Sequence, residues 1–210
     1  MKLTDNNFIH HTAFVGDEVT MGHDNYIGPF CYLTGRLDIG DNNRFEAHCS
    51  VGTRAEHKTY WDEDGPTEIV NDNMFREYIT INAGTEGLTS IGSNVIMLRG
   101  SHVAHDCVIE DGVTLSCDAI MLGHVRVMKH SNCGSGCQVH QHQVIGSYSM
   151  IGMGCIVTKK TNVEPGQVWV GNPAKRIKTN MLALDKHDVD EFDLVEETAR
   201  YSELISAAKL

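Results

Sequence analysis

An apolar residue recurs at every sixth position along most of this chain, and this period constrains the fold more than any other feature. With two interruptions, the register is kept at Ile9, Val15, Met21, Ile27, Leu33, Ile39, Phe45, Val51, Ile69, Phe75, Ile81, Ile91, Met97, Val103, Ile109, Leu115, Met121, Val127, Cys133, Val139, Ile145, Ile151, Val157, Val163 and Trp169. A period of six fits neither the 3.6-residue repeat of an amphipathic helix nor the two-residue alternation of a strand. It fits a chain that forms a short strand, turns and repeats, so the sequence predicts an all-β solenoid.

Two segments interrupt the repeat, and a third follows it. Residues 53–68 are polar, aromatic and charged, and they predict a loop ejected from the solenoid, whereas residues 82–90 predict a smaller loop. The period ends after Gly171-Asn172-Pro173, and the remaining residues predict one or two helices. We therefore expect a β-helix domain over 1–172 and a helical extension over 173–210. The apolar residues of the extension that suit packing against a neighbouring surface are Phe192, Val195, Ala199, Leu204 and Ile205.

Composition narrows the classes of function. Seventeen Lys and Arg residues against 28 Asp and Glu give a formal net charge of −11, which argues against general nucleic-acid binding. No run of 18 apolar residues is present, and the N-terminus lacks a signal-peptide core, so neither a membrane span nor secretion is expected. Seven cysteines without a CxxC pair predict reduced, mostly buried thiols in a cytoplasmic protein.

The hexapeptide repeat resembles that of the hexapeptide acyltransferases. Their fold is a left-handed parallel β-helix in which three hexads form one 18-residue coil, and the resemblance implies a little over eight such coils here. Residues 18 apart then lie on adjacent coils. This arithmetic stacks His105 below Gly123 and Gln141, and it stacks Asp106 below His124 and His142.

Three interpretations suit this cluster of polar residues, which His102 and His140 border. One is a stack of solvent-facing corner residues. Another is a metal site, but the spacing His102-x2-His105 differs from the His-x4-His of zinc-bearing β-helix enzymes, and no metal is expected. In the third, His105 is a general base, Asp106 orients it, and the N–H of Gly123 stabilises an oxyanion. We favour the third because it accounts for all three residue types at their positions.

Several motifs resemble one branch of the superfamily, the UDP-N-acetylglucosamine O-acyltransferases that begin lipid A synthesis. They are the segments 102–107, 123–125 and 139–141, supported by 27–31, 76–81 and 87–89. The resemblance implies that His105 and Asp106 are the catalytic pair and that Gly123 supplies the oxyanion N–H. It also implies a substrate pocket lined by His102, His124 and His140, beside which Gln141 and His142 lie.

The same resemblance extends to partners and to more distant residues. It implies a homotrimer with each site between two subunits, acyl carrier protein as the thioester donor, a nucleotide sugar as the acceptor, and no cofactor. Lys58 matches a loop lysine of the family, and Met153 matches the position that limits acyl-chain length. Only Lys186 falls near the position where the family carries a basic pair that helps hold the nucleotide.

The predicted activity is therefore transfer of a 3-hydroxyacyl group from acyl carrier protein to a UDP-amino sugar such as UDP-N-acetylglucosamine. The alternative is an amino-sugar O- or N-acetyltransferase that uses acetyl-CoA, because residues 171–175 resemble the closing motif of such enzymes. A zinc-bearing hydratase and a catalytically silent scaffold are further alternatives. A group of basic residues near the end of the repeat could bind either an acidic carrier protein or the phosphates of CoA. These residues are Lys159, Lys160, Lys175, Arg176 and Lys178.

Overall fold

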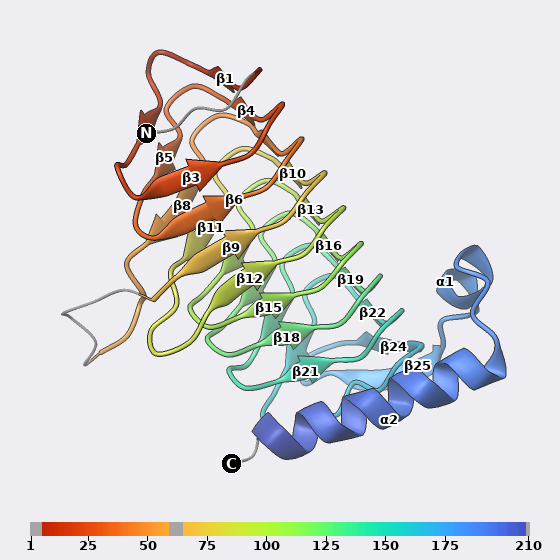
Figure 1. Ribbon diagram of the computed structural model, residues 1–210. Coiled ribbons are helices and arrows are strands. Elements are labelled where there is room, and N and C mark those ends of the chain that lie inside the picture. The colour runs from red at the N-terminus through yellow and green to blue at the C-terminus, as the bar shows by residue number, and fades with distance from the viewer. Residues whose placement is uncertain (1–5, 59–64, 209–210) are drawn as a thin grey trace.

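The chain forms a parallel β-solenoid whose three faces are each one sheet (Figure 1). The structure is a computed structural model, and it describes residues 6–58 and 65–208. The ten-stranded face contains β1 (Phe8–Ile9), β4 (Tyr26–Ile27), β7 (Arg44–Phe45), β10 (Met74–Phe75), β13 (Ile96–Met97), β16 (Thr114–Leu115), β19 (Asn132–Cys133), β22 (Met150–Ile151), β24 (Gln167–Val170) and β25 (Lys175–Thr179).

The other two faces follow the ten-stranded face in turn around each coil. The eight-stranded face contains β2 (Phe14–Val15), β5 (Tyr32–Leu33), β8 (Ser50–Thr53), β11 (Thr80–Asn82), β14 (His102–Val103), β17 (Ile120–Met121), β20 (Gln138–Val139) and β23 (Ile156–Val157). The seven-stranded face contains β3 (Val19–Met21), β6 (Leu37–Ile39), β9 (Thr67–Ile69), β12 (Thr89–Ile91), β15 (Val108–Ile109), β18 (Arg126–Val127) and β21 (Val144–Ile145).

Strands stack in the register that the 18-residue coil predicts. His102 of β14 pairs with Ile120 of β17, and Ile120 pairs with Gln138 of β20. The six-residue column points inward and is buried along most of its length, with only its first two members, Ile9 and Val15, and its last, Trp169, partly exposed. Six cysteines pack inside as small apolar side chains, as predicted, namely Cys31, Cys49, Cys107, Cys133, Cys137 and Cys155. The predicted solenoid is therefore confirmed.

Asparagines replace apolar residues at one inner corner of the first coils. Each asparagine side chain accepts a hydrogen bond from the backbone of the next coil, as Asn25 Oδ1 does from Asn43 N–H at 2.8 Å. Asn43 Oδ1 then accepts from Asn73 Nδ2 at 2.9 Å, and Asn73 Oδ1 accepts from Val95 N–H at 2.7 Å. These three asparagines are almost fully buried, so the ladder satisfies polar groups that would otherwise be costly inside the solenoid.

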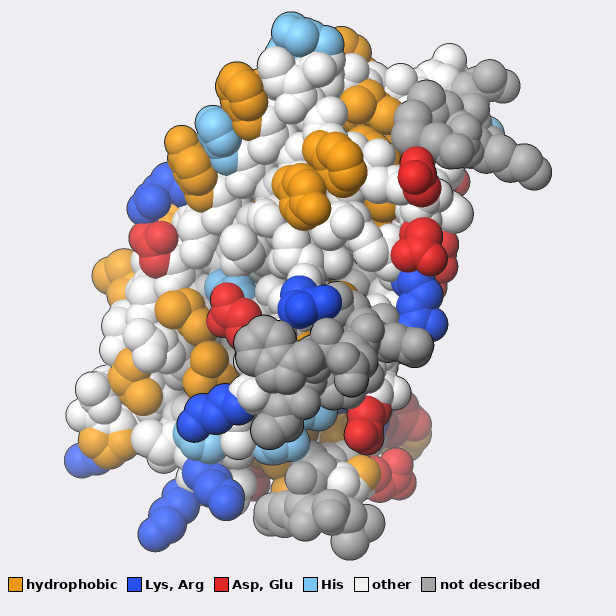
Figure 2. Space-filling model, turned by 90° about the vertical axis from the view of Figure 1, so that its left-hand side faces the viewer, with side chains coloured by type: hydrophobic (Ala, Val, Ile, Leu, Met, Phe, Trp, Pro, Cys, Tyr) orange, Lys and Arg blue, Asp and Glu red, His pale blue; other side chains and the backbone are white. Residues whose placement is uncertain are grey.

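Aromatic side chains stack on the outside of the same early coils. Phe30, His48 and Tyr78 follow one another along a corner with ring centroids 5.1 and 4.9 Å apart. Phe30 and Tyr78 are each 58% exposed. Figure 2 shows this part of the molecule as a surface with several separate hydrophobic side chains exposed to solvent.

The segment after residue 172 differs from the purely helical extension that the sequence predicts. Lys175–Thr179 forms β25, which pairs antiparallel with β24. The edge of β24 offers unpaired backbone groups, and a five-residue segment that satisfies them is too short to show a clear strand period. Helices follow only at α1 (Met181–Lys186) and α2 (Glu191–Ala208).

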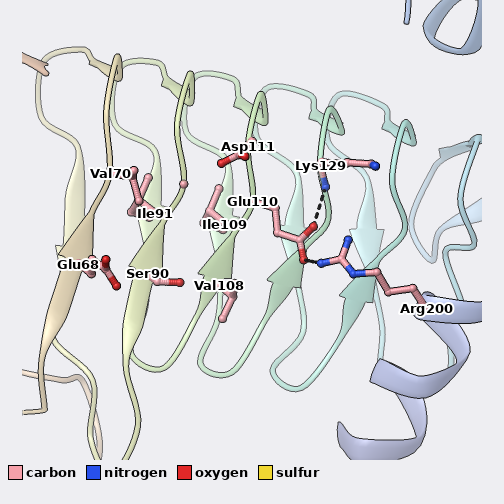
Figure 3. Close-up of a pocket in the computed structure, with 11 residues that line it drawn as sticks. Glu68, Val70, Ser90, Ile91, Val108, Ile109, Glu110, Asp111, Lys129 and Arg200 are labelled. Carbon is pink, nitrogen blue, oxygen red and sulfur yellow. Dashed lines mark hydrogen bonds and ion pairs between the residues drawn. The ribbon is translucent and has the colours of Figure 1, made fainter. Parts of the chain in front are cut away.

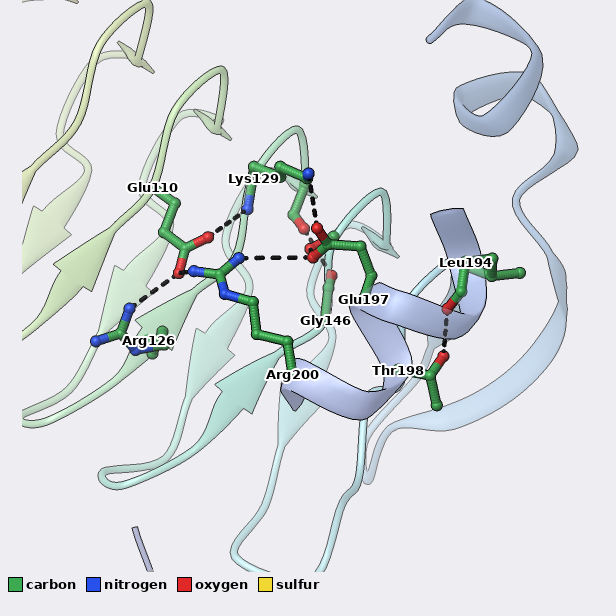
Figure 4. A network of polar contacts seen from close by, with 10 residues as sticks. Glu110, Arg126, Lys129, Gly146, Leu194, Glu197, Thr198 and Arg200 are labelled. Carbon is green, nitrogen blue, oxygen red and sulfur yellow. Dashed lines mark hydrogen bonds and ion pairs between the residues drawn. The ribbon is translucent and has the colours of Figure 1, made fainter. Parts of the chain in front are cut away.

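α2 lies across the C-terminal end of the solenoid, in contact with β21 (Figure 1). Two ion pairs hold it there: Arg200 contacts Glu110 at 2.6 Å, and Lys129 Nζ contacts Glu197 at 2.6 Å (Figure 4). Within the helix, Arg200 also contacts Glu197 at 3.5 Å. Tyr201 of α2 is buried against Met128 and Val144 of the solenoid.

Candidate active site

The predicted catalytic residues lie at one corner of the solenoid, where the chain leaves the eight-stranded face for the seven-stranded face. We call this the third corner. In successive coils it is formed by residues 104–107, 122–125 and 140–143. The loop 83–88 and the described parts of the predicted ejected loop, 54–58 and 65–66, also lie between these two faces, whereas residues 59–64 of that loop lie outside the described residues. His124 N–H donates to His105 C=O and His142 N–H donates to Gly123 C=O, so the stacking predicted from the 18-residue coil is confirmed.

His105 and Asp106 form a close pair. His105 Nδ1 lies 2.7 Å from Asp106 Oδ2, and the two side chains are only 9% and 6% exposed. Because an ionised carboxylate can only accept, the hydrogen bond places the proton of a neutral imidazole on Nδ1. The lone pair of Nε2 is then available to accept a proton, as a general base requires.

Four hydrogen bonds surround the Asp106 carboxylate. Thr85 donates its N–H to Oδ1 at 2.9 Å and its hydroxyl to Oδ2 at 2.6 Å. Gly87 N–H donates to Oδ1 at 3.0 Å, and His105 completes the set. Burial favours the neutral acid, but the hydrogen bonds from Thr85 and His105 outweigh it and lower the pKa of Asp106. The carboxylate is therefore ionised at neutral pH.

Gly123 lies against the imidazole of His105. A Cβ atom at this glycine would lie 2.7 Å from both Cε1 and Nε2 of His105, so a larger residue cannot occupy the position without moving the ring. Among the residues that the structure describes, none accepts a hydrogen bond from the N–H of Gly123. Gly123 therefore carries an N–H donor on the residue that lies against Nε2, and such a donor is suited to stabilise negative charge that develops on a substrate.

A row of imidazoles continues from His105 along the third corner. His124 meets His105 edge-on with ring centroids 5.1 Å apart, and His142 stacks on His124 at 4.4 Å. On the other side, His57 of the ejected loop meets His105 edge-on at 5.5 Å. Burial lowers the pKa of His124 despite the nearby charge of Asp106, so His124 is neutral at physiological pH. Sequence analysis missed His57, because the path of an ejected loop does not follow the coil period.

The other histidines predicted to contact substrate border this row. His102 lies on β14, where its Nδ1 is 2.7 Å from the hydroxyl of Thr80, and burial lowers its pKa. His140 Nδ1 contacts the carbonyl of Gln141 at 3.0 Å, and the side chain of Gln141 is exposed. Lys58 follows His57 directly in the chain.

Two predicted site residues lie elsewhere in this chain. Met153 follows β22, at the corner between the ten-stranded and eight-stranded faces, and is 79% exposed. Lys186 ends α1, and the next residue, His187, stacks on His130 between the seven-stranded and ten-stranded faces. The structure of one chain therefore does not bring Met153 or Lys186 to the third corner.

The same cluster has the spacing of a possible metal site, because one ligand atom each of His105, Asp106 and His124 lies within 4.8 Å of the others. The hydrogen bonds decide between the two interpretations. A carboxylate has about four lone-pair sites, and the four hydrogen bonds to Asp106 occupy that number. This arrangement favours an orienting role for Asp106 over metal ligation.

A separate hollow of about 350 Å³ lies on the seven-stranded face, between β9, β12, β15 and α2 (Figure 3). Its floor contains Val70, Ile91 and Val108, and its polar wall contains Glu110 and Arg200. Those two charges already bind each other and hold α2 in place. The third corner is therefore the better candidate for catalysis.

None of the helices in the part of the chain that the structure describes is long and apolar enough to span a membrane. No protein-family model matches the sequence. Among curated proteins, the chain is 33% identical over 174 residues to the acyl-acyl-carrier-protein–UDP-N-acetylglucosamine O-acyltransferase of Nautilia profundicola, covering 81% of this chain and 66% of that protein. It is 30% identical over 187 residues to that of Campylobacter concisus, covering 85% and 71%.

Solved structures show the same relationship. LpxA of Acinetobacter baumannii superimposes with a TM-score of 0.75 at 26% identity, covering 98% of this chain and 89% of that one. The UDP-N-acetylglucosamine acyltransferase of Bacteroides fragilis shares the fold, with a TM-score of 0.77 at 24% identity and coverage of 96% and 90%. The chain spans between 59% and 71% of the length of the curated relatives it matches. By its sequence and its fold, the chain belongs to the UDP-N-acetylglucosamine O-acyltransferase family.

Proposed function

We propose that the protein transfers a 3-hydroxyacyl group from acyl carrier protein to a hydroxyl of UDP-N-acetylglucosamine. One observation carries this proposal. His105 has its Nδ1 bound to an ionised Asp106 and its Nε2 against Gly123, so the base lies next to a residue whose N–H can act as a hydrogen-bond donor. The relatives' names supply the substrates, and the geometry supplies the chemistry.

In the proposed reaction, the acceptor hydroxyl gives its proton to His105 Nε2 while its oxygen attacks the thioester carbonyl. The carbonyl oxygen becomes an oxyanion, and the Gly123 N–H stabilises it. Asp106 stabilises the imidazolium that forms. Collapse of the intermediate breaks the C–S bond, and the phosphopantetheine thiol leaves with the proton from Nε2. His57, His102, His124, His140 and His142 would line the pocket.

The remaining residues fit the proposal as parts of an assembly. The basic strand β25 and the neighbouring Lys159 and Lys160 would attract an acidic carrier protein. Met153 and Lys186 lie away from the third corner of their own chain, so they would reach a site only by contributing to that of another subunit. We therefore propose a homotrimer, to be measured by light scattering coupled to size-exclusion chromatography, with acyl transfer located in the cytoplasm.

A turnover assay read by mass spectrometry tests the proposed function. UDP-N-acetylglucosamine and a UDP-amino sugar are each incubated with 3-hydroxyacyl carrier proteins of several chain lengths and, in parallel, with acetyl-CoA. We expect product from carrier protein with UDP-N-acetylglucosamine. Product from acetyl-CoA alone would establish the alternative acetyltransferase, and no product with any pair would overturn acyl transfer to these acceptors.

A further inference from the structure

We propose that Thr85, in the small loop 83–88, is a positioning residue that fixes the Asp106 carboxylate for its work on His105. This inference rests on the proposed function, because it assigns a part in the same proton transfer. Thr85 is the one residue that contacts both oxygens of Asp106 among the hydrogen bonds described above, through its N–H to Oδ1 and its hydroxyl to Oδ2.

The hydroxyl of Thr85 acts on the oxygen that matters most for catalysis. Asp106 Oδ2 accepts from Thr85 Oγ1 at 2.6 Å and from His105 Nδ1 at 2.7 Å. Two donors at fixed places on one oxygen leave the carboxylate a single orientation. Asp106 is also held from the backbone, because its N–H donates to the hydroxyl of Thr89 at 2.8 Å.

The backbone of the small loop is shaped around the same carboxylate. A Cβ atom on Gly87 would lie 3.0 Å from Asp106 Oδ1, and one on Gly84 would lie 2.2 Å from the carbonyl oxygen of Gly87. Glycine at both positions therefore lets the loop close on Asp106. The ejected loop supports this arrangement, since Gly65 N–H donates to Gly84 C=O at 2.6 Å.

The hydroxyl of Thr85 affects the basicity of His105 as well as the orientation of Asp106. It draws electron density from Oδ2 and so weakens the hold of Asp106 on the proton at His105 Nδ1. Without the Thr85 hydroxyl, Asp106 Oδ2 becomes a stronger acceptor and stabilises the imidazolium of His105 more than in the wild-type protein. His105 would then keep its proton to higher pH and would also be oriented less tightly.

The test compares Thr85→Val, which removes the hydroxyl but keeps the shape and the backbone N–H, with Thr85→Ser, which restores the hydroxyl. Thr114→Val, on the ten-stranded face, is the matched control for the substitution itself. The readouts are kcat and KM for acyl transfer across pH 5–9, and the titration midpoint of His105 by NMR. The NMR signal is assigned with His105→Gln and needs no turnover.

For Thr85→Val we expect about a tenfold loss of kcat with KM unchanged, and a His105 midpoint that rises by about half a pH unit. Thr85→Ser should restore both, and Thr114→Val should change neither. An unchanged midpoint in Thr85→Val, or a Ser variant that behaves like Val, would overturn the inference. If the wild-type protein transfers no acyl group but the midpoint still rises in Thr85→Val, the proposed function fails while the positioning role of Thr85 stands.

Discussion

Replacing Gly123 with alanine isolates the contact between the oxyanion donor and the base. The added Cβ would lie 2.7 Å from Cε1 and Nε2 of His105. Carbon atoms in ordinary contact are about 3.5 Å apart or more, so the ring must retreat by roughly 1 Å. Gly123 does not have a positive φ angle, so alanine introduces no backbone strain at this site. The perturbation therefore falls on the position of His105.

The size of the expected loss of activity follows from the displacement of the His105 ring. A displacement of about 1 Å at a reacting group can cost about 100-fold in rate, which corresponds to about 2.7 kcal/mol in the activation barrier. The effect on stability should be smaller, because the atoms in the way belong to a side chain that can move. Overpacking of this kind costs about 1 kcal/mol at its low end, which lowers the melting temperature of a protein of this size by about 2–4 °C.

The assay measures kcat for acyl transfer together with thermal unfolding followed by circular dichroism. Gly16→Ala is the matched control, because Gly16 also follows a strand of the eight-stranded face and its Cβ would meet neighbours only at 3.5 Å. We expect a loss of kcat in Gly123→Ala alone. If Gly123→Ala keeps more than half of the wild-type kcat, the proposed contact between Gly123 and a productive His105 is wrong.

Three further predictions concern charge. Asp106→Asn should keep the fold, as measured by circular dichroism, but lower kcat about 100-fold, because a neutral amide cannot stabilise the imidazolium. Full activity in this variant would refute the proposed catalytic pair of His105 and Asp106. The wild-type rate should fall on acidification as His105 becomes protonated, and a flat profile of kcat/KM from pH 5 to 8 would contradict a histidine base. Glu197→Gln should lower the free energy of unfolding in urea by about 1–2 kcal/mol at pH 7, since Lys129 loses its carboxylate partner and Arg200 loses one of its two. Burial opposes ionisation of Glu197, but the hydrogen bonds from Lys129 and Ser147 outweigh it and lower its pKa, so the folded state gains stability from this carboxylate above its unfolded pKa of about 4.3. That gain is lost as the pH falls through the folded pKa of Glu197. The difference in free energy of unfolding between the wild-type protein and Glu197→Gln should therefore become smaller at acidic pH. A difference that stays constant with pH would contradict this account.

The sequence predicts the solenoid and its histidine cluster because both depend on one period. Once a coil has 18 residues, His124 must lie above Asp106 and Gly123 above His105, whatever the surrounding residues are. The contacts made by the loops depend on no period. Thr85 reaches Asp106 across 21 residues rather than 18, because the small loop leaves the coil between them.

The contacts of the C-terminal segment are also only partly predictable from the sequence. An apolar pattern predicts that α2 packs against a surface, and Leu204 and Ile205 do pack against the solenoid. Phe192 and Val195 remain 67% and 61% exposed, because the face of α2 that turns toward the solenoid carries Glu197, Arg200 and Tyr201 instead. The pair Glu110–Arg200 joins residues 90 apart in sequence, and no local pattern predicts such a contact.

The most direct test of the account compares the wild-type protein with His105→Ala, using UDP-N-acetylglucosamine and the best 3-hydroxyacyl carrier protein as substrates. Initial rates are measured by mass spectrometry at equal concentrations of folded protein. The account predicts that the wild-type protein forms the acylated sugar nucleotide and that His105→Ala is slower by about 10²–10⁴-fold. A variant within a few-fold of wild type would show that His105 is not the base.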